Sequence, residues 1–450
     1  MSSQRTELDH LPRRLGVGAL WLLIINGMIG AGIFGIPAEA ARLVGDFSPL
    51  LFLLTALLMA PVLLCFAELS SATRETGGPA RYVGIAFGPM AGFQAGWALY
   101  IARLTALAAN FNLLQSALAH FWPTLGEAGP RVLSLGLLTA LIAVLNIIGV
   151  RWAMRSLGVL TVGKLLPLLA LTGFGLIELM DVQFIDAQLI NGQLVAVTTQ
   201  FATPSVWPTH EADIGAALLL MIYAFVGFES GLIPGGEARN PQRDMPRALL
   251  AAMLLCGALY ALMQWVCLAL LPELASTPRP LVALGEILFG PVGAVLVLAT
   301  IILSVGGNLF GSMFSVPRVS YSLAREGLLP SAFAQISPRY QTPVFSIVVY
   351  ALLGWTLAAS GSFVWLAALS VLTRLLIYLA CIAAMPAVRR QAPADAWQLR
   401  GGPILPLLGV AFCLALLTQV SWQSVLATVL LLAVGSLLYL LARWKARARD

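Results

Sequence analysis

Apolar residues form long segments along the whole chain, and short polar stretches separate them. A helix of about 20 apolar residues crosses a bilayer, because it satisfies every backbone N–H and C=O without water. The pattern therefore predicts an all-α, polytopic membrane protein with twelve transmembrane helices. We expect them at residues 17–41, 48–69, 86–117, 131–150, 156–178, 214–236, 247–271, 283–317, 343–359, 363–387, 403–420 and 423–442. Three segments exceed the usual length, which allows tilted helices or irregular ends.

The composition excludes several other classes of protein. Of the 450 residues, 59% are hydrophobic and only 10% are charged, against roughly 25% charged residues in a soluble domain. This excludes an ordinary cytosolic enzyme, a disordered protein and a nucleic-acid binder, and the net charge of +6 does not argue for nucleic acid. The apolar surplus runs from end to end, so we expect one domain embedded in a lipid bilayer.

Cysteine and histidine suggest no redox or metal chemistry. Residues 118–131 contain no cysteine, which argues against a disulfide-linked partner subunit. The three histidines fall in predicted tails or loops, which leaves no histidine relay or haem site in the membrane. We expect no disulfides, no metal and no cofactor. The five cysteines all lie inside apolar segments: Cys65, Cys256, Cys267, Cys381 and Cys413.

The distribution of Arg and Lys predicts the orientation. With twelve spans, 20 of these residues fall on the side of the two termini, 3 fall on the other side, and 3 lie within spans. Cytoplasmic loops carry this excess of positive charge, so we expect both tails, 1–16 and 443–450, in the cytoplasm. Residues 179–213 contain no Lys or Arg and form the expected outer loop. The expected location is a cell membrane, specifically a bacterial inner membrane.

Two spans contain residues that interrupt a helix. Four glycines and a proline occupy eleven residues of the first span, and residues 223–236 of the sixth are similar. Glycine also permits close packing of membrane helices, but a pair of broken helices at matching places is the best sequence indication of a transporter site. An offset of 197 residues pairs Gly30 with Gly227 and Arg42 with Arg239. This indicates inverted repeats at 17–178 and 214–387, followed by two helices in 388–442.

Interrupted helices expose main-chain groups that bind small charged molecules. Free N–H groups at the start of a half-helix carry positive dipole and bind a carboxylate. Carbonyls that lack their helical partners accept hydrogen bonds from an ammonium group. Together they fit a free α-amino acid. The expected carboxylate site comprises Ile29, Gly30, Ala31 and Gly32, and the expected amine site comprises Tyr223, Ala224 and Val226.

Four sets of residues along the chain form recognisable motifs: Gly27–Phe34; Ala67–Leu69 with Gly77–Pro79; Gly227–Glu229 with Glu237–Arg247; and Arg318 with Tyr321–Pro330 and Thr342–Pro343. In these motifs the chain resembles the amino acid–polyamine–organocation (APC) superfamily of permeases. The resemblance covers most of the chain, and it implies a LeuT-like fold of five plus five helices in inverted repeats that works by alternating access. It also implies that the glycine motif binds the substrate carboxylate and that the break in the sixth span binds the amine.

An ionisable residue inside a membrane needs a specific reason to be there. Lys164 lies well inside the fifth span. Its side chain either extends to the cytoplasmic face or, as we favour, satisfies carbonyls freed by the first break, in place of a coupling Na⁺. Many members of the resembling superfamily have a lysine here. We therefore expect Na⁺-independent transport, with Lys164 either a fixed cation or a proton-linked switch.

Three further charges lie in the membrane. Glu229 either caps the second half of the sixth span or takes part in proton coupling. For Arg103 we favour pairing with Glu229 or another acid over substrate contact, and Arg374 has no assigned partner.

Three apolar or aromatic side chains complete the candidate site. Tyr223 either covers the bound ligand as a gate or only packs between helices. Leu104 and Phe111, on the third span, are candidates for lining the pocket of the substrate side chain.

The predicted function is secondary active transport of amino acids, Na⁺-independent and coupled to protons. The alternatives are an obligate exchanger of amino acids, or of an amino acid for a polyamine, and an amino acid sensor that transports nothing. A membrane enzyme is disfavoured, because the spans hold no cluster of catalytic side chains. The amino acid carried, the choice between symport and exchange, and the oligomeric state are left open.

Overall fold

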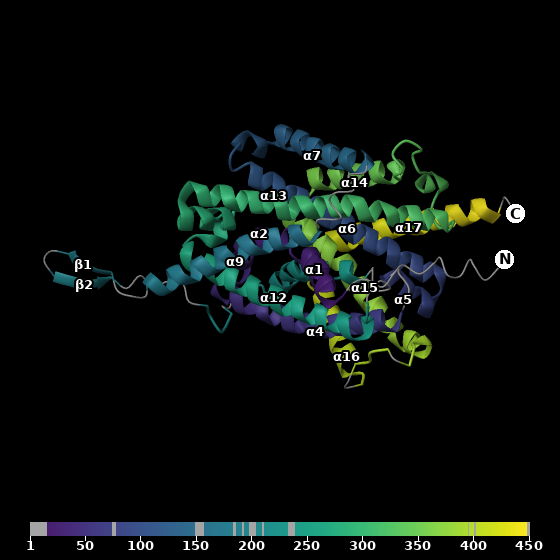
Figure 1. Cartoon of the computed structure of the whole chain (residues 1–450), viewed down its shortest axis with the longest axis horizontal. Helices are drawn as coiled ribbons and strands as arrows, with labels where there is room; N and C mark the ends of the chain where they lie inside the picture. Colours follow the sequence, from purple (N-terminus) through teal and green to yellow (C-terminus); the bar gives the residue numbers. More distant parts are fainter. Residues whose placement is uncertain are drawn as a thin grey trace.

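The computed structural model describes residues 16–73, 78–148, 157–182, 186–190, 193–197, 204–208, 211–232, 239–394, 396–399 and 402–447. Long helices run roughly side by side along the longest axis of the molecule (Figure 1). A hairpin of β1 (Asp186–Ile190) and β2 (Gln193–Val197) projects at one end of this axis, and α17 (Trp422–Arg447) ends at the other (Figure 1).

The helices follow the predicted segments closely. The first half contains α1 (Val17–Met28), α2 (Gly32–Gly35), α3 (Pro37–Val44), α4 (Ser48–Ala72), α5 (Gly78–Phe87), α6 (Pro89–Leu118), α7 (Ala128–Ile148) and α9 (Leu157–Val182). The second half contains α10 (Ile214–Phe225), α11 (Glu229–Leu232), α12 (Pro241–Leu270), α13 (Pro280–Arg325), α14 (Val344–Ser360), α15 (Phe363–Gln391), α16 (Ile404–Leu417) and α17 (Trp422–Arg447). Short 3₁₀ turns lie at Gly45–Phe47, Pro123–Gly126, Leu274–Ser276 and Ser331–Ala334.

Eight helices of the described chain are long and apolar enough to cross a membrane, and three shorter apolar helices accompany them. Broad hydrophobic surfaces of these helices are exposed, as on a protein surrounded by lipid. The fold is therefore that of a helical membrane protein. Twelve crossings remain a prediction.

Three features differ from the predicted pattern. The expected outer loop contains a hairpin, in which β1 (Asp186–Ile190) pairs antiparallel with β2 (Gln193–Val197). The polar stretch after the second span contains α5, which folds back on α6 because Gly84 and Gly92 let the two backbones approach closely. The eighth predicted span is two helices, since Gly290 has a φ of +63° before Pro291 and turns the chain sharply.

The broken segments lie in the interior of the bundle. α1 packs against α12, α9 and α11, while α10 packs against α15, α3 and α4, and α2 contacts α10. Most side chains of these segments are buried, including Ile25, Met28 and Phe225. The surrounding helices thus hold both interruptions in the protein core, away from the lipid.

Candidate functional site at two broken helices

The first interruption follows Met28, where α1 ends. Ile29 is extended, with ψ at 90°, and the chain resumes a helical turn at Ala31. The Gly30 N–H donates back to the Met28 carbonyl at 2.9 Å. Within the described chain, the N–H groups of Ala31, Gly32 and Ile33 reach no main-chain acceptor. The start of α2 therefore presents free donors, as expected for a carboxylate site.

The second interruption follows Phe225, where α10 ends. Val226 is extended, with ψ at 161°, and Gly227 has a φ of +105°, a conformation that side-chain-bearing residues avoid. In a continuous helix the Gly227 N–H would donate to the Tyr223 carbonyl, but here it donates to the Glu229 carboxylate at 2.7 Å. Among the described residues, no main-chain donor reaches the carbonyls of Tyr223 or Ala224.

The two interruptions have the same local design. Adding 197 to the bounds of α1 gives those of α10, and adding 197 to the bounds of α2 gives those of α11. The extended residues, Ile29 and Val226, are related by the same offset. The offset that paired the two glycine motifs in the sequence therefore also pairs the helix ends.

The two breaks are in direct contact. A Cβ atom on Gly227 would collide with the carbonyl oxygen of Gly27, and a Cβ on Gly32 would lie 2.7 Å from the Cα of Ala224. Only glycine permits these approaches. Consequently the free donors of the first break and the free acceptors of the second lie beside each other.

Lys164 on α9 fills part of the first break. Its ammonium donates to the carbonyl of Asn26 at 2.9 Å and to that of Ile29 at 2.7 Å, and the residue is 1% exposed. The Ile29 carbonyl also accepts from the Ser304 hydroxyl at 3.4 Å. The Tyr260 hydroxyl donates to the Met28 carbonyl at 3.2 Å. The freed carbonyls of α1 thus receive side-chain donors, which is the contact that we expected of Lys164.

Glu229 belongs to a buried network on the other side of the second break. One carboxylate oxygen accepts from Arg374 Nε at 3.1 Å and from the Tyr378 hydroxyl at 2.7 Å, while the other accepts the Gly227 N–H. The Arg374 guanidinium also donates to the carbonyl of Ala102 at 3.1 Å. The pair links α11, α15 and α6. Arg374 therefore has the partner that the sequence left unassigned.

Arg103 is half-buried on α6, next to Ala102 of this network. It interacts electrostatically with both Glu229 and Arg374, and direct pairing with Glu229 or another acid stays a prediction.

The three other candidate side chains all lie in the interior. Tyr223 is 5% exposed and packs edge-to-face on Phe363, and its hydroxyl has no hydrogen-bond partner among the described residues. Phe111 is fully buried, and Leu104 lies beside Gly354 of α14. Their roles in gating and in lining a pocket stay predictions.

Two amide side chains at the first break, those of Asn110 and Asn308, were not predicted from the sequence. A Cβ on Gly30 would lie 2.6 Å from Asn308 Nδ2 and 3.9 Å from Asn110 Oδ1. That Asn110 oxygen has no hydrogen-bond partner in the described chain. A buried amide inside an apolar helix is costly when unpaired. Both residues could therefore have been chosen by the reasoning that singled out Lys164.

Comparison with known proteins decides the family. A family model described as amino acid permease matches residues 15–440. The chain belongs to this family of amino acid permeases. Its APC resemblance is thereby confirmed, and so is the prediction that it is a permease and not an enzyme. Together with the apolar helices, membership makes this permease a multi-pass membrane protein.

Named relatives of the permease cover most of its length. It is 27% identical to the serine/threonine exchanger SteT of Bacillus subtilis, over 90% of each chain. It is 24% identical to the branched-chain amino acid permease BcaP of the same organism, over 96% of this chain and 93% of the other. It is 30% identical to the human Asc-type amino acid transporter 1, over 76% and 65% of the two chains.

Proposed function

We propose that this permease is a secondary active transporter of amino acids that works by alternating access. The observation that carries the proposal is the contact between the two breaks, where a Cβ on Gly32 would lie 2.7 Å from the Cα of Ala224. An α-amino acid carries its carboxylate and its ammonium on one carbon, so it fits anion donors and cation acceptors that lie side by side. The names of the relatives support the same substrate class.

Each break has its own role in this proposal. The substrate carboxylate binds at Ile29–Gly32, chiefly through the free N–H groups of Ala31 and Gly32. The substrate ammonium binds the carbonyls of Tyr223, Ala224 and Val226. Tyr223 covers the ligand, and Leu104 and Phe111 line the space for the substrate side chain.

A thermal-shift panel of free amino acids and polyamines on the purified protein tests this assignment, because a ligand stabilises the state that binds it. We expect an amino acid to raise the unfolding midpoint. Gly30→Leu should abolish the shift, since its side chain enters the space beside the free N–H groups. The matched control is Gly173→Leu, a membrane glycine with open space around it. An amino acid that still stabilises Gly30→Leu contradicts the carboxylate site.

We further propose that transport is independent of Na⁺. The Lys164 ammonium donates to two carbonyls of the first break and so supplies the positive charge that a bound cation would supply. Lys164 is then either a fixed cation or the group that exchanges the coupled proton. Uptake into proteoliposomes with and without Na⁺, and with and without an inward proton gradient, separates these possibilities. Uptake that vanishes without Na⁺ rejects the proposal.

For Glu229 we propose a capping role in place of proton coupling. Its carboxylate accepts three hydrogen bonds, including one from the Arg374 guanidinium, and all of them favour the charged form. Protonating it would leave the buried Arg374 guanidinium without its counter-charge, with only neutral hydrogen-bond acceptors around it. Glu229 therefore holds the second break open, and Lys164 is the remaining candidate for a proton-exchanging group.

Obligate exchange is the second candidate function. It is favoured by SteT, a relative named as an exchanger that aligns over 90% of each chain. Counterflow without net uptake would establish exchange, and net uptake driven by a proton gradient would establish symport. Binding without either flux would identify a sensor.

We also propose the LeuT-like arrangement, with inverted repeats at 17–178 and 214–387, two further helices in 388–442, and both termini in the cytoplasm of a bacterial cell. The constant offset between the broken helices supports the repeats. The excess of Arg and Lys on one side supports the orientation. Labelling of single cysteines introduced into the outer loop and the tails, from each side of the membrane, tests it.

A further inference from the structure

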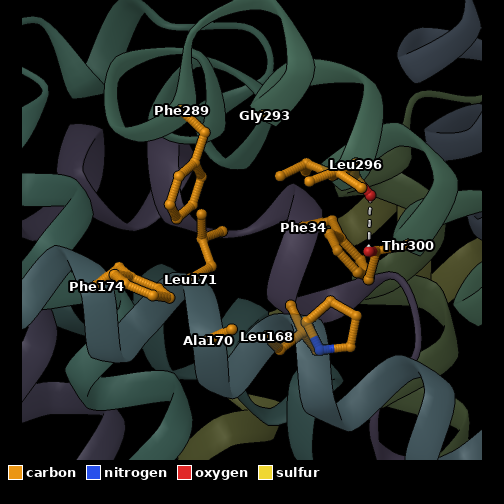
Figure 2. A pocket seen from close by; sticks show the side chains of 11 residues that line it. Phe34, Leu168, Ala170, Leu171, Phe174, Phe289, Gly293, Leu296 and Thr300 are labelled. Carbon is orange, nitrogen blue, oxygen red and sulfur yellow. Dashed lines mark hydrogen bonds between the residues drawn. The ribbon is translucent and has the colours of Figure 1, made fainter.

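A cavity of about 350 Å³ lies between α9 and α13, away from the free main-chain groups of the two breaks. Its walls are Pro167–Phe174 on α9 and Phe289–Thr300 on α13, and Phe34 of α2 contributes from inside (Figure 2). The cavity size falls in the range of small-molecule sites.

The lining of the cavity is almost entirely apolar. Thr300 is the polar side chain of its lining, and its hydroxyl donates to the Leu296 carbonyl at 2.8 Å (Figure 2). Water would find at most this one hydroxyl oxygen, fewer than the roughly two to four polar partners that hold a water molecule in a buried cavity. A hydrocarbon ligand therefore fits, and a charged or hydrogen-bonding ligand does not.

The mouth of the cavity is continuous with the lipid-facing surface. The rim residues Phe174, Phe289 and Leu296 are 52%, 40% and 57% exposed, and the two phenylalanine rings meet edge-to-face. Both α9 and α13 are apolar enough to span a membrane. The hydrocarbon that surrounds these helices is the bilayer itself, so its acyl chains have direct access.

The dimensions suit a chain within one leaflet. The α9 wall runs for about 10 Å along its helix, at 1.5 Å per residue. One leaflet contributes about 15 Å to the hydrocarbon core. We propose that this cavity binds one acyl chain of a membrane lipid.

The inner end of the chain then contacts α2, the half-helix that begins at the proposed carboxylate site. Phe34 is 3% exposed and lies beside Thr300, on the side of the cavity away from Phe174 (Figure 2). It belongs to α2, the half-helix whose Gly32 touches α10. A bound chain thus supports α2 from the lipid side.

Photolabelling tests the proposal without any substrate, so its result is independent of the transport function. The full-length protein is reconstituted in phosphatidylethanolamine and phosphatidylglycerol vesicles that contain a trace of phosphatidylglycerol with a diazirine near the end of one acyl chain. After photolysis, peptides are mapped. We expect label on Phe34, which bulk lipid cannot reach. Label on exposed Phe174 without label on Phe34 overturns the proposal.

Two variants separate the cavity from the general lipid surface. Ala170→Trp fills the cavity and should reduce labelling of Phe34 at least fivefold. Leu169→Trp, on the neighbouring residue that is 45% exposed and outside the lining, should leave it unchanged. Equal labelling in both variants, or loss in both, contradicts the assignment. A free aryl diazirine is tested in the same way. If it labels Phe34 and the probe on the acyl chain does not, the proposal is wrong and the cavity binds a small apolar ligand instead of an acyl chain.

Discussion

The Lys164 ammonium lies 2.7 Å from the carbonyl oxygen of Ile29, 135 residues away in the sequence. It also binds the carbonyl of Asn26, so one buried cation satisfies two acceptors that the first break has freed. A buried acceptor left without a partner costs about 1–3 kcal/mol.

The Ile29 carbonyl keeps its longer contacts with Ser304 and Asn308 when the ammonium is removed, whereas the Asn26 carbonyl loses its donor. We therefore expect Lys164→Met to lower the unfolding free energy by about 1–3 kcal/mol and to stop uptake. Thermal unfolding in detergent and proteoliposome uptake measure the two effects. The control is Thr172→Val on the same helix, whose hydroxyl binds only within the protein core, to Leu168 and Met263. A Lys164→Met protein as stable and active as the wild type would show that the ammonium is dispensable.

The Glu229–Arg374 pair predicts a strong coupling between two mutations. Both side chains are at most 2% exposed, and removing one partner of a buried pair costs about 3–5 kcal/mol. We expect Glu229→Gln and Arg374→Met each to destabilise by this amount, and the double variant to lose much less than their sum. Unfolding of the four proteins in bicelles measures the cycle. Strictly additive losses would mean that the two groups do not depend on each other.

Comparing Gly227→Ala with Gly88→Ala separates the cost of backbone strain from the cost of the close contact between the two broken helices. The positive φ of Gly227 costs about 1–3 kcal/mol for a residue with a side chain, and its Cβ would also collide with the Gly27 carbonyl. Gly88→Ala has similar strain, at a φ of +87°, but has open space around it. We expect Gly227→Ala to be the more destabilising variant in thermal unfolding, and also to weaken substrate binding. If the two variants lose the same stability, the contact of Gly227 with the Gly27 carbonyl does not contribute to the effect.

Local sequence was sufficient to locate the interruptions. Glycine and proline act on the backbone of their own neighbourhood, so the break after Met28 and the break after Phe225 could be predicted without any tertiary contact. Lys164 was found because an isolated charge in an apolar span is costly wherever it points. Predicting these features requires only the type of each residue and its depth in the membrane.

Other parts of the site depend on contacts between distant segments. Arg374 and Glu229 are separated by 145 residues, and nothing near either one shows which helix brings the partner. Asn110 and Asn308 likewise lie at the first break only because α6 and α13 both pack beside Gly30. The turn at Gly290 is a partial exception, since the Gly-Pro sequence favours it, but the hydrophobic run around it indicated one continuous helix.

Two ion pairs in the chain should differ in strength because the carboxylate of one is buried, although its partner Arg389 is 37% exposed. Glu68 is 2% exposed at the end of α4 and accepts from Arg389 of α15 at 2.5 and 3.0 Å, and also from the Leu399 N–H at 3.0 Å. Glu39 and Arg42 form a similar two-bond pair within α3, but their side chains are 23% and 57% exposed. Exposed pairs contribute about 0–1 kcal/mol to stability.

Glu68 also anchors the segment after α15, so Glu68→Gln should destabilise the protein by about 2–4 kcal/mol. Glu39→Gln should change thermal unfolding very little. If the two variants unfold alike, Glu68 does not fasten α4 to α15.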